Sequence, residues 1–251
     1  MNTSATTPTP EPVAGLSPVA RITNIFFSPS TTFADLKRKP SWWVAWLLIS
    51  VVSLIFVFAM QQKIGFDRMV QNEINASPKT VEQLDKMPPE QREQRMQIST
   101  TVTKYISYGT PVFILIVNVI IAAVLMATFN FGFGTEVSFG LSMALVFYSF
   151  IPEILKSILG AISLYAGADP DGFNPRNPIA TNLGFFISRT DHPVLYSLGS
   201  SVDIFGIWVL ILLGIGFATV SKVKRGTAIS VIAGWYILIA LAGAGWVAAF
   251  A

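Results

Sequence analysis

Apolar residues gather in five long runs along the chain, and polar residues fill the stretches between them. The runs cover residues 42–60, 109–130, 137–165, 203–221 and 226–250. A helix needs about 20 apolar residues to cross the roughly 30 Å hydrocarbon core of a bilayer, and each run meets or nearly meets that length. Backbone groups in lipid must bond within their own segment, and the alternating strands of a membrane barrel are not seen. The pattern therefore predicts an all-α polytopic membrane bundle with five transmembrane helices.

The segment ahead of the first run predicts two different structures. Residues 1–15 are polar and rich in Pro and Thr, which predicts a disordered tail. Residues 16–41 repeat apolar side chains at helical spacing, for example Val19, Ile22 and Phe26, and end in a basic cluster. This pattern is typical of N-terminal interfacial helices that lie in the cytoplasmic headgroup layer. A packed linker, whose basic residues only set the topology, explains the same pattern.

Two long polar loops connect the runs. In the loop 61–108, Pro78 and Pro89 each stand where a helix would start, because proline favours the first helical position. The loop is therefore expected to form a small extramembrane helical cap that continues into the second run. The loop 166–202 begins with many Asp, Asn, Pro and Gly residues, which favours turns.

Composition excludes most soluble and catalytic classes. Hydrophobic residues make up 52% of the chain and charged residues 12%, against roughly 25% charged in soluble domains. There is no cysteine, and the single histidine, His192, stands in a proline-flanked loop without a nucleophile elbow. A histidine-based zinc site needs at least two histidines, and no phosphate-binding loop is present. The sequence therefore predicts a non-enzymatic protein with no cofactor, no metal site and no nucleic-acid partner.

Two basic clusters beside the apolar runs predict how the chain is oriented in the membrane. Their members are Lys37, Arg38, Lys39, Lys222, Lys224 and Arg225. Cytoplasmic loops carry an excess of Lys and Arg, so both clusters should face the cytoplasm and contact lipid headgroups. With five spans, this requires the N-terminus inside and the C-terminus outside. The loop 61–108 has seven basic residues, but its six acidic residues offset them.

The third run has the most informative polar residues. Pro152 removes a backbone hydrogen bond and predicts a bend. Glu153 and Lys156 follow it. A charge at the bilayer centre costs about 2.5–3.5 kcal/mol, whereas a Glu–Lys pair three residues apart returns only about 0.2–0.5 kcal/mol on a helix in water. Both side chains should therefore face the bundle interior, water, or polar groups such as Asn118 and Tyr148.

These intramembrane polar candidates allow two interpretations. In the first, Glu153 and Lys156 form a substrate or proton site on a bent helix, as in a small transporter or channel. In the second, they form a buried ion pair that fixes the register of the helices. Only these two ionisable residues lie in the interior of the runs, and a transport path usually shows more convergence. The structural interpretation is therefore favoured.

Several segments resemble the Yip (Ypt/Rab-interacting protein) membrane family, in its bacterial branch. The likeness is carried by RITNIFFSPSTTFADLKRKPSWW ahead of the first run, YSFIPEILKSILGAI in the third, NPRNPIATNLGFF in the last loop, and SSVDIFGIWVLILLGIGFATVSKVKRGTA. The resemblance implies a five-helix domain over residues 42–251 in the bacterial cytoplasmic (inner) membrane. Eukaryotic members bind small GTPases through a cytosolic N-terminal region. Here that region is short and matches no GTPase-binding motif, so this role is not transferred.

Taken with the composition, the resemblance favours an integral membrane protein that organises membrane, lipid or protein partners. The expected partners are the lipid bilayer and membrane proteins, including a second copy of the chain. The alternative is a small transporter or channel that uses Glu153 and Lys156.

Overall fold

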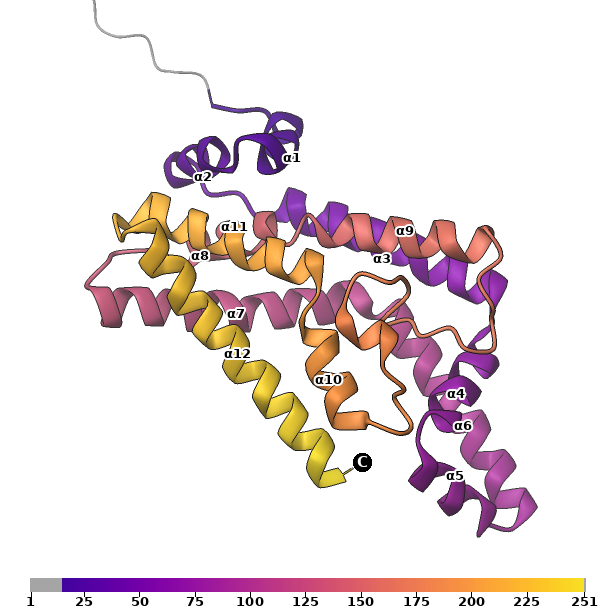
Figure 1. The fold of residues 1–251 in the computed structure, drawn as a ribbon. Helices are drawn as coiled ribbons and strands as arrows, with labels where there is room; N and C mark the ends of the chain where they lie inside the picture. Colours follow the sequence, from indigo (N-terminus) through magenta and orange to yellow (C-terminus); the bar gives the residue numbers. More distant parts are fainter. Residues whose placement is uncertain (1–14, 251) are drawn as a thin grey trace, which may run out of the picture.

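The computed structural model describes residues 15–250, which fold into a bundle of α-helices (Figure 1). In chain order these are α1 (Pro18–Phe27), α2 (Pro29–Arg38), α3 (Trp43–Lys63), α4 (Phe66–Asn75), α5 (Pro78–Asp85), α6 (Pro89–Tyr108), α7 (Thr110–Phe133), α8 (Phe139–Ser149), α9 (Glu153–Tyr165), the 3-10 helix η1 (Leu183–Phe186), α10 (Pro193–Ser201), α11 (Ile204–Ser221) and α12 (Arg225–Phe250). Within this part of the chain, β pairing is limited to one bridge between Asn182 and Asp203. The predicted tail, residues 1–15, lies outside the described residues except for Gly15.

Five helical segments are long and apolar enough to cross a membrane: α3, α7, the α8–α9 pair, α11 and α12. Each falls on one of the five apolar runs, which confirms the predicted all-α bundle with five candidate spans. The five are packed to different extents, since 50% of the third span is buried within the chain but only 17% of α12. Figure 1 shows α12 crossing α11 near its start and then leaving the other spans at an angle.

The third span is broken in two at the position where Pro152 predicts a bend. α8 ends at Ser149 and α9 begins at Glu153. The turn between them is held by tight hydrogen bonds, such as the Glu153 amide donating to the Phe150 carbonyl at 3.1 Å. Every residue of α8 from Leu141 to Ser149 is buried, whereas most of α9 stays partly exposed. The break therefore separates a central helix from a peripheral one.

The N-terminal helices α1 and α2 pack against α8 and α11. Ile25 and Phe33 are fully buried. The Phe33 ring lies so close to Gly216 of α11 that a Cβ at that glycine would come within 3.2 Å of the ring. The packed-linker interpretation accounts for these buried side chains. Val19 and Phe27 remain 72% and 84% exposed, so the pair also keeps apolar surface that the chain does not cover.

A buried ion pair joins α1 to α2. Arg21 Nε donates to Asp35 Oδ2 at 2.7 Å, and both side chains are almost fully buried. The other carboxylate oxygen accepts from Arg38 at 2.7 Å and from the Leu16 amide at 3.2 Å. Burial by itself raises the pKa of the Asp35 carboxyl, but these hydrogen bonds outweigh it and hold the pKa below its ordinary value. Asp35 is therefore ionised at neutral pH, and the pair persists.

Helices α4, α5 and α6 form the extramembrane cap expected from the prolines. α5 begins at Pro78 and α6 at Pro89, with the proline at the first helical position in each. Arg92 of α6 donates to the Leu84 carbonyl at 2.9 Å and so fixes the end of α5. Only Gly109 separates α6 from α7, so the cap leads directly into the second span, as the sequence predicts.

Close contact between α11 and α12 depends on Gly214. A Cβ built at this glycine would lie 2.3 Å from Cγ1 and 2.9 Å from Cα of Ile229 on α12. The two backbones approach to a distance that leaves no room for a side chain, as is common at membrane helix interfaces.

We expect Gly214→Ala to lower the free energy of unfolding by about 1–3 kcal/mol, the usual cost of forcing a methyl group into a packed interface. Gly234→Ala is the matched control, because the space around Gly234 on α12 is open. Thermal and denaturant unfolding in detergent micelles would measure both. Equal losses in the two variants would contradict the assignment of Gly214 to a packed interface.

Candidate functional site

The lysine of the third span pairs with an aspartate that begins the fourth. Lys156 Nζ lies 3.0 Å from Asp203 Oδ2, with the two side chains 18% and 5% exposed. The expected pairing of Lys156 with Glu153 is therefore wrong. Asp203 is the better partner because it is already fixed as the N-cap of α11, where its Oδ1 accepts the Phe205 and Gly206 amides.

Polar side chains from the loop after α9 complete the surroundings of Asp203. Thr181 Oγ1 donates to Asp203 Oδ2 at 2.7 Å, and Asn182 Nδ2 donates to the same oxygen at 3.3 Å. Asn182 is also paired with Asn177 through their side-chain amides, and both residues are buried. This polar junction joins α9, α11 and the loop, so it holds the loop against the bundle.

Glu153 lies beside the junction and shares one cavity with Lys156. Two adjoining cavities, of about 280 and 270 Å³, lie between α3, α7 and α9 and share Glu153, Ser53 and Ser157 as walls. Among the described residues, no hydrogen bond or ion pair reaches the Glu153 carboxylate. The second cavity is also lined by Asn118, whose Oδ1 is buried without a hydrogen-bond partner. The structure thus brings Glu153 and Asn118 to one cavity.

Tyr148 lies elsewhere, although the sequence grouped it with these residues. It belongs to α8 and is fully buried. Its hydroxyl is close to Arg21 and Asp35 of the N-terminal pair, instead of facing the cavities beside Glu153. Pro152 separates the two environments because it ends α8 and precedes α9.

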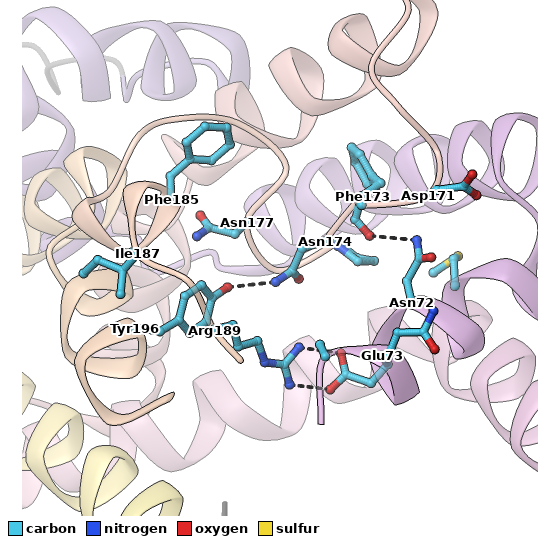
Figure 2. A pocket seen from close by; sticks show the side chains of 16 residues that line it. Asn72, Glu73, Asp171, Phe173, Asn174, Asn177, Phe185, Ile187, Arg189 and Tyr196 are labelled. Carbon is cyan, nitrogen blue, oxygen red and sulfur yellow. Dashed lines mark hydrogen bonds and ion pairs between the residues drawn. The ribbon is translucent and has the colours of Figure 1, made fainter. Parts of the chain in front are cut away.

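A larger pocket of about 470 Å³ opens outside the spans, between α4 and the loop that follows α9 (Figure 2). Across it, the guanidinium of Arg189 forms two hydrogen bonds with the Glu73 carboxylate, at 2.7 and 2.9 Å. These bonds hold the pKa of Glu73 below its ordinary value and raise that of Arg189. The pair is therefore charged at neutral pH and ties the cap to the loop.

Other contacts around this pocket are also structural. Asn72 Nδ2 donates to the Pro170 carbonyl at 2.7 Å, and Asn174 Nδ2 donates to the Tyr196 hydroxyl at 2.8 Å. Figure 2 shows the Asn174–Tyr196 bond and a further bond from Asn72 to the Phe173 carbonyl. Over residues 15–250, no group of three His, Asp or Glu side chains is placed to hold a metal ion. The pocket contains no nucleophile–base pair, and its polar groups mainly join the cap to the loop.

The six basic residues predicted to contact headgroups surround the opposite end of the bundle. Lys37 donates to the Val220 carbonyl at 2.9 Å and so caps the C-terminus of α11, while Arg225 donates to Ser30 at 3.1 Å. The others are Arg38, which pairs with Asp35, and the exposed Lys39, Lys222 and Lys224. Part of this charge therefore holds α2 on the bundle, and part faces outward.

Sequence reasoning missed Asp203, Thr181 and Arg189. A signal for Asp203 existed, since an aspartate directly before an apolar run is a frequent N-cap. No sequence signal pairs Asp203 with Lys156, because 47 positions separate them. The Arg189–Glu73 contact spans 116 positions and likewise needs the folded chain to be seen.

We expect Lys156→Met to lower the free energy of unfolding by about 3 kcal/mol, because it leaves the buried Asp203 carboxylate without its counter-ion. Lys86→Met is the control, since it breaks the exposed Lys86–Glu82 pair, which is worth roughly 0.3–0.5 kcal/mol. Denaturant unfolding in micelles distinguishes the two. Lys156→Arg should retain most of the stability, and a loss for Lys156→Met as small as the control's would refute the junction.

A known protein family matches most of the chain described above. The sequence model of the Yip1 domain matches residues 23–247, which include part of α1, α2, both long loops and all but the last residues of the fifth span. No curated protein and no solved structure is significantly similar to the chain. Together with its five apolar helices, this match shows that the chain belongs to the Yip family of integral membrane proteins.

Proposed function

We propose that this chain is a non-enzymatic membrane protein that organises lipid or protein partners around its bundle. The observation that carries the proposal is the exposed apolar surface of α12. From Trp235 onward its large apolar side chains are exposed, with Ile239 64% and Leu241 58% accessible. A helix that leaves its own bundle presents a surface that lipid or another membrane protein must cover.

The glycines of the last two spans support this proposal. Gly206, Gly214 and Gly216 of α11 each contact a neighbouring side chain of the same chain. Around Gly234, Gly243 and Gly245 of α12, the space where a Cβ would stand is open. Small residues let helix backbones approach each other closely in membranes. The open glycines of α12 therefore suit close approach by a helix from outside the chain, either a second copy or another membrane protein.

The orientation of the chain in the membrane is part of the same proposal. The contacts of Lys37 with Val220 and of Arg225 with Ser30 place both basic clusters at one end of the bundle. The excess of Lys and Arg beside cytoplasmic span ends supports N-terminus in and C-terminus out, in a bacterial cytoplasmic membrane. The cap and the loop 166–202 would then lie together on the outer side.

A photo-crosslinking residue at Ile239 tests the α12 surface in native membranes. We expect a discrete protein adduct, either with a second copy or with another membrane protein, because this side chain points away from the bundle. The same residue at Ile232, which is 4% exposed, is the matched control and should give no adduct. If Ile239 gives no discrete protein adduct, or if Ile232 gives the same one, α12 is not a protein-binding surface.

A second function, transport, is favoured by one specific observation. Glu153 lines two adjoining cavities within the candidate spans, and the second also has the unpartnered Asn118 Oδ1. A carboxylate that faces such a space without an ion-pair partner is placed to bind a proton or a cation. Lys156 contributes less to such a transport site than the sequence suggested, because it forms an ion pair with Asp203.

If the protein transports protons or cations, proteoliposomes should show a pH-dependent flux that Glu153→Gln reduces by at least about tenfold, a typical loss for removing a group that carries the proton. Glu136→Gln is the control, since Glu136 is exposed in the turn between α7 and α8. The measurement is an internal pH-sensitive dye after an imposed gradient. Equal flux from wild type and Glu153→Gln would rule out this path.

A further inference from the structure

A second extramembrane groove adjoins the pocket of Figure 2, with which it shares Asn174, Arg189 and Tyr196, and lies where three segments meet. It has a volume of about 630 Å³ and is bounded by the start of α5, the loop and α10, and the end of α12. We call it the α10–α12 groove; its basic side chains are Lys79, Arg176 and Arg189. Figure 1 shows α10 lying between the distal half of α12 and the cap.

The charged side chains that line the α10–α12 groove are all basic. No Asp or Glu is among the described residues that line it. Arg189 is already neutralised by Glu73 on the side of the neighbouring pocket. Lys79 and Arg176 are exposed, and within the described part of the chain neither side chain forms a hydrogen bond or ion pair. Arg176 acts electrostatically on Glu73, but the carboxylate of Glu73 is bonded to Arg189. The groove thus offers two cations outside any ion pair to a ligand of negative charge.

Hydroxyl and amide groups stand beside these cations. Thr190, Ser197 and Asn174 line the same space. Such side chains donate to phosphate oxygens, and a guanidinium binds phosphate in a bidentate manner. The combination of two cations with several neutral donors and no carboxylate is suited to a phosphate group and disfavours a metal ion.

The opposite wall comes from the last turns of a candidate span. Trp246 and Val247 of α12 line the groove, and Trp246 is 68% exposed. Tryptophan is enriched at membrane–water interfaces, where the polar part of a lipid begins. Leu195 of α10, 54% exposed, adds apolar surface to the neighbouring helix. A ligand in the groove would therefore meet positive charge at one end and the apolar surface of the spans at the other.

We propose that the α10–α12 groove binds the phosphate of an anionic phospholipid, with Lys79 and Arg176 as its ligands and the acyl chains against α12. This deepens the proposed function by naming one class of partner, and it rests on that proposal only in placing α12 in the bilayer. A free phosphate fits the cations but not the apolar wall. A neutral lipid fits the wall but leaves both cations without a counter-charge.

Native mass spectrometry of the full chain, released from micelles containing phosphatidylglycerol, tests the proposal. We expect a saturable phosphatidylglycerol adduct that Lys79→Gln with Arg176→Gln weakens about thirtyfold, since each cation near an anionic lipid contributes about fivefold. Arg95→Gln with Lys104→Gln is the matched control, because it removes the same charge from exposed positions on α6. The control should bind within about twofold of wild type. Lys79→Arg with Arg176→Lys should retain the adduct.

Each other outcome would overturn the assignment. Equal losses in the two Gln pairs would mean nonspecific attraction by the charge of the cap. Equal binding of phosphatidylcholine would mean that the cations are not used, and competition by millimolar inorganic phosphate would indicate a free-anion site. Unfolding temperatures report whether the Gln variants fold, and Arg176→Gln alone tests the site if the double variant does not. The cross-linking test at Ile239 involves neither cation, so the two proposals fail separately.

Discussion

The break between Ser149 and Glu153 is the constraint on which the rest of the structure depends. An uninterrupted helix over the third run would have a single set of neighbours along its length. Because the helix breaks at Pro152, the first half is enclosed by α1, α2, α3, α7 and α11, whereas the second half runs mainly beside α3. The N-terminal helices contribute to this enclosure, since both α1 and α2 contact α8.

Two buried carboxylates in the structure lie where the chain can pair them with a basic side chain. Arg21 and Asp35 pair between the N-terminal helices, and Lys156 pairs with Asp203 where the fourth span begins. In each case an additional backbone amide bonds to the carboxylate, so little of its hydrogen-bonding capacity is lost on burial. Glu153 differs because it faces a cavity instead of a partner. That difference is the reason for a transport alternative beside the organising role.

Much of the fold could be predicted from the sequence because its signals are local. Apolar runs of span length, Pro78 and Pro89 as helix starts, and Pro152 as a helix end all act through adjacent residues. The site could be predicted less well, because it depends on contacts between distant segments. Glu153 and Lys156 were identified as the polar residues of the third span, yet their partner was misassigned, since Asp203 reaches Lys156 only through the folding of the loop 166–202. The Arg189–Glu73 bridge has no local signal at all.

The two ends of the bundle differ in how they use positive charge, and this difference bears on function. At one end, Lys37 and Arg225 are engaged by α11 and α2, so the charge stabilises the fold while it sets the topology. At the other end, Lys79 and Arg176 form no ion pair within the described chain and line the same groove as the last turns of α12. Trp246 and Val247 of α12 therefore share a groove with these cations, which has an apolar and a basic part. A phospholipid has the same division along its length, which connects the departure of α12 from the bundle with the charge left open at its end.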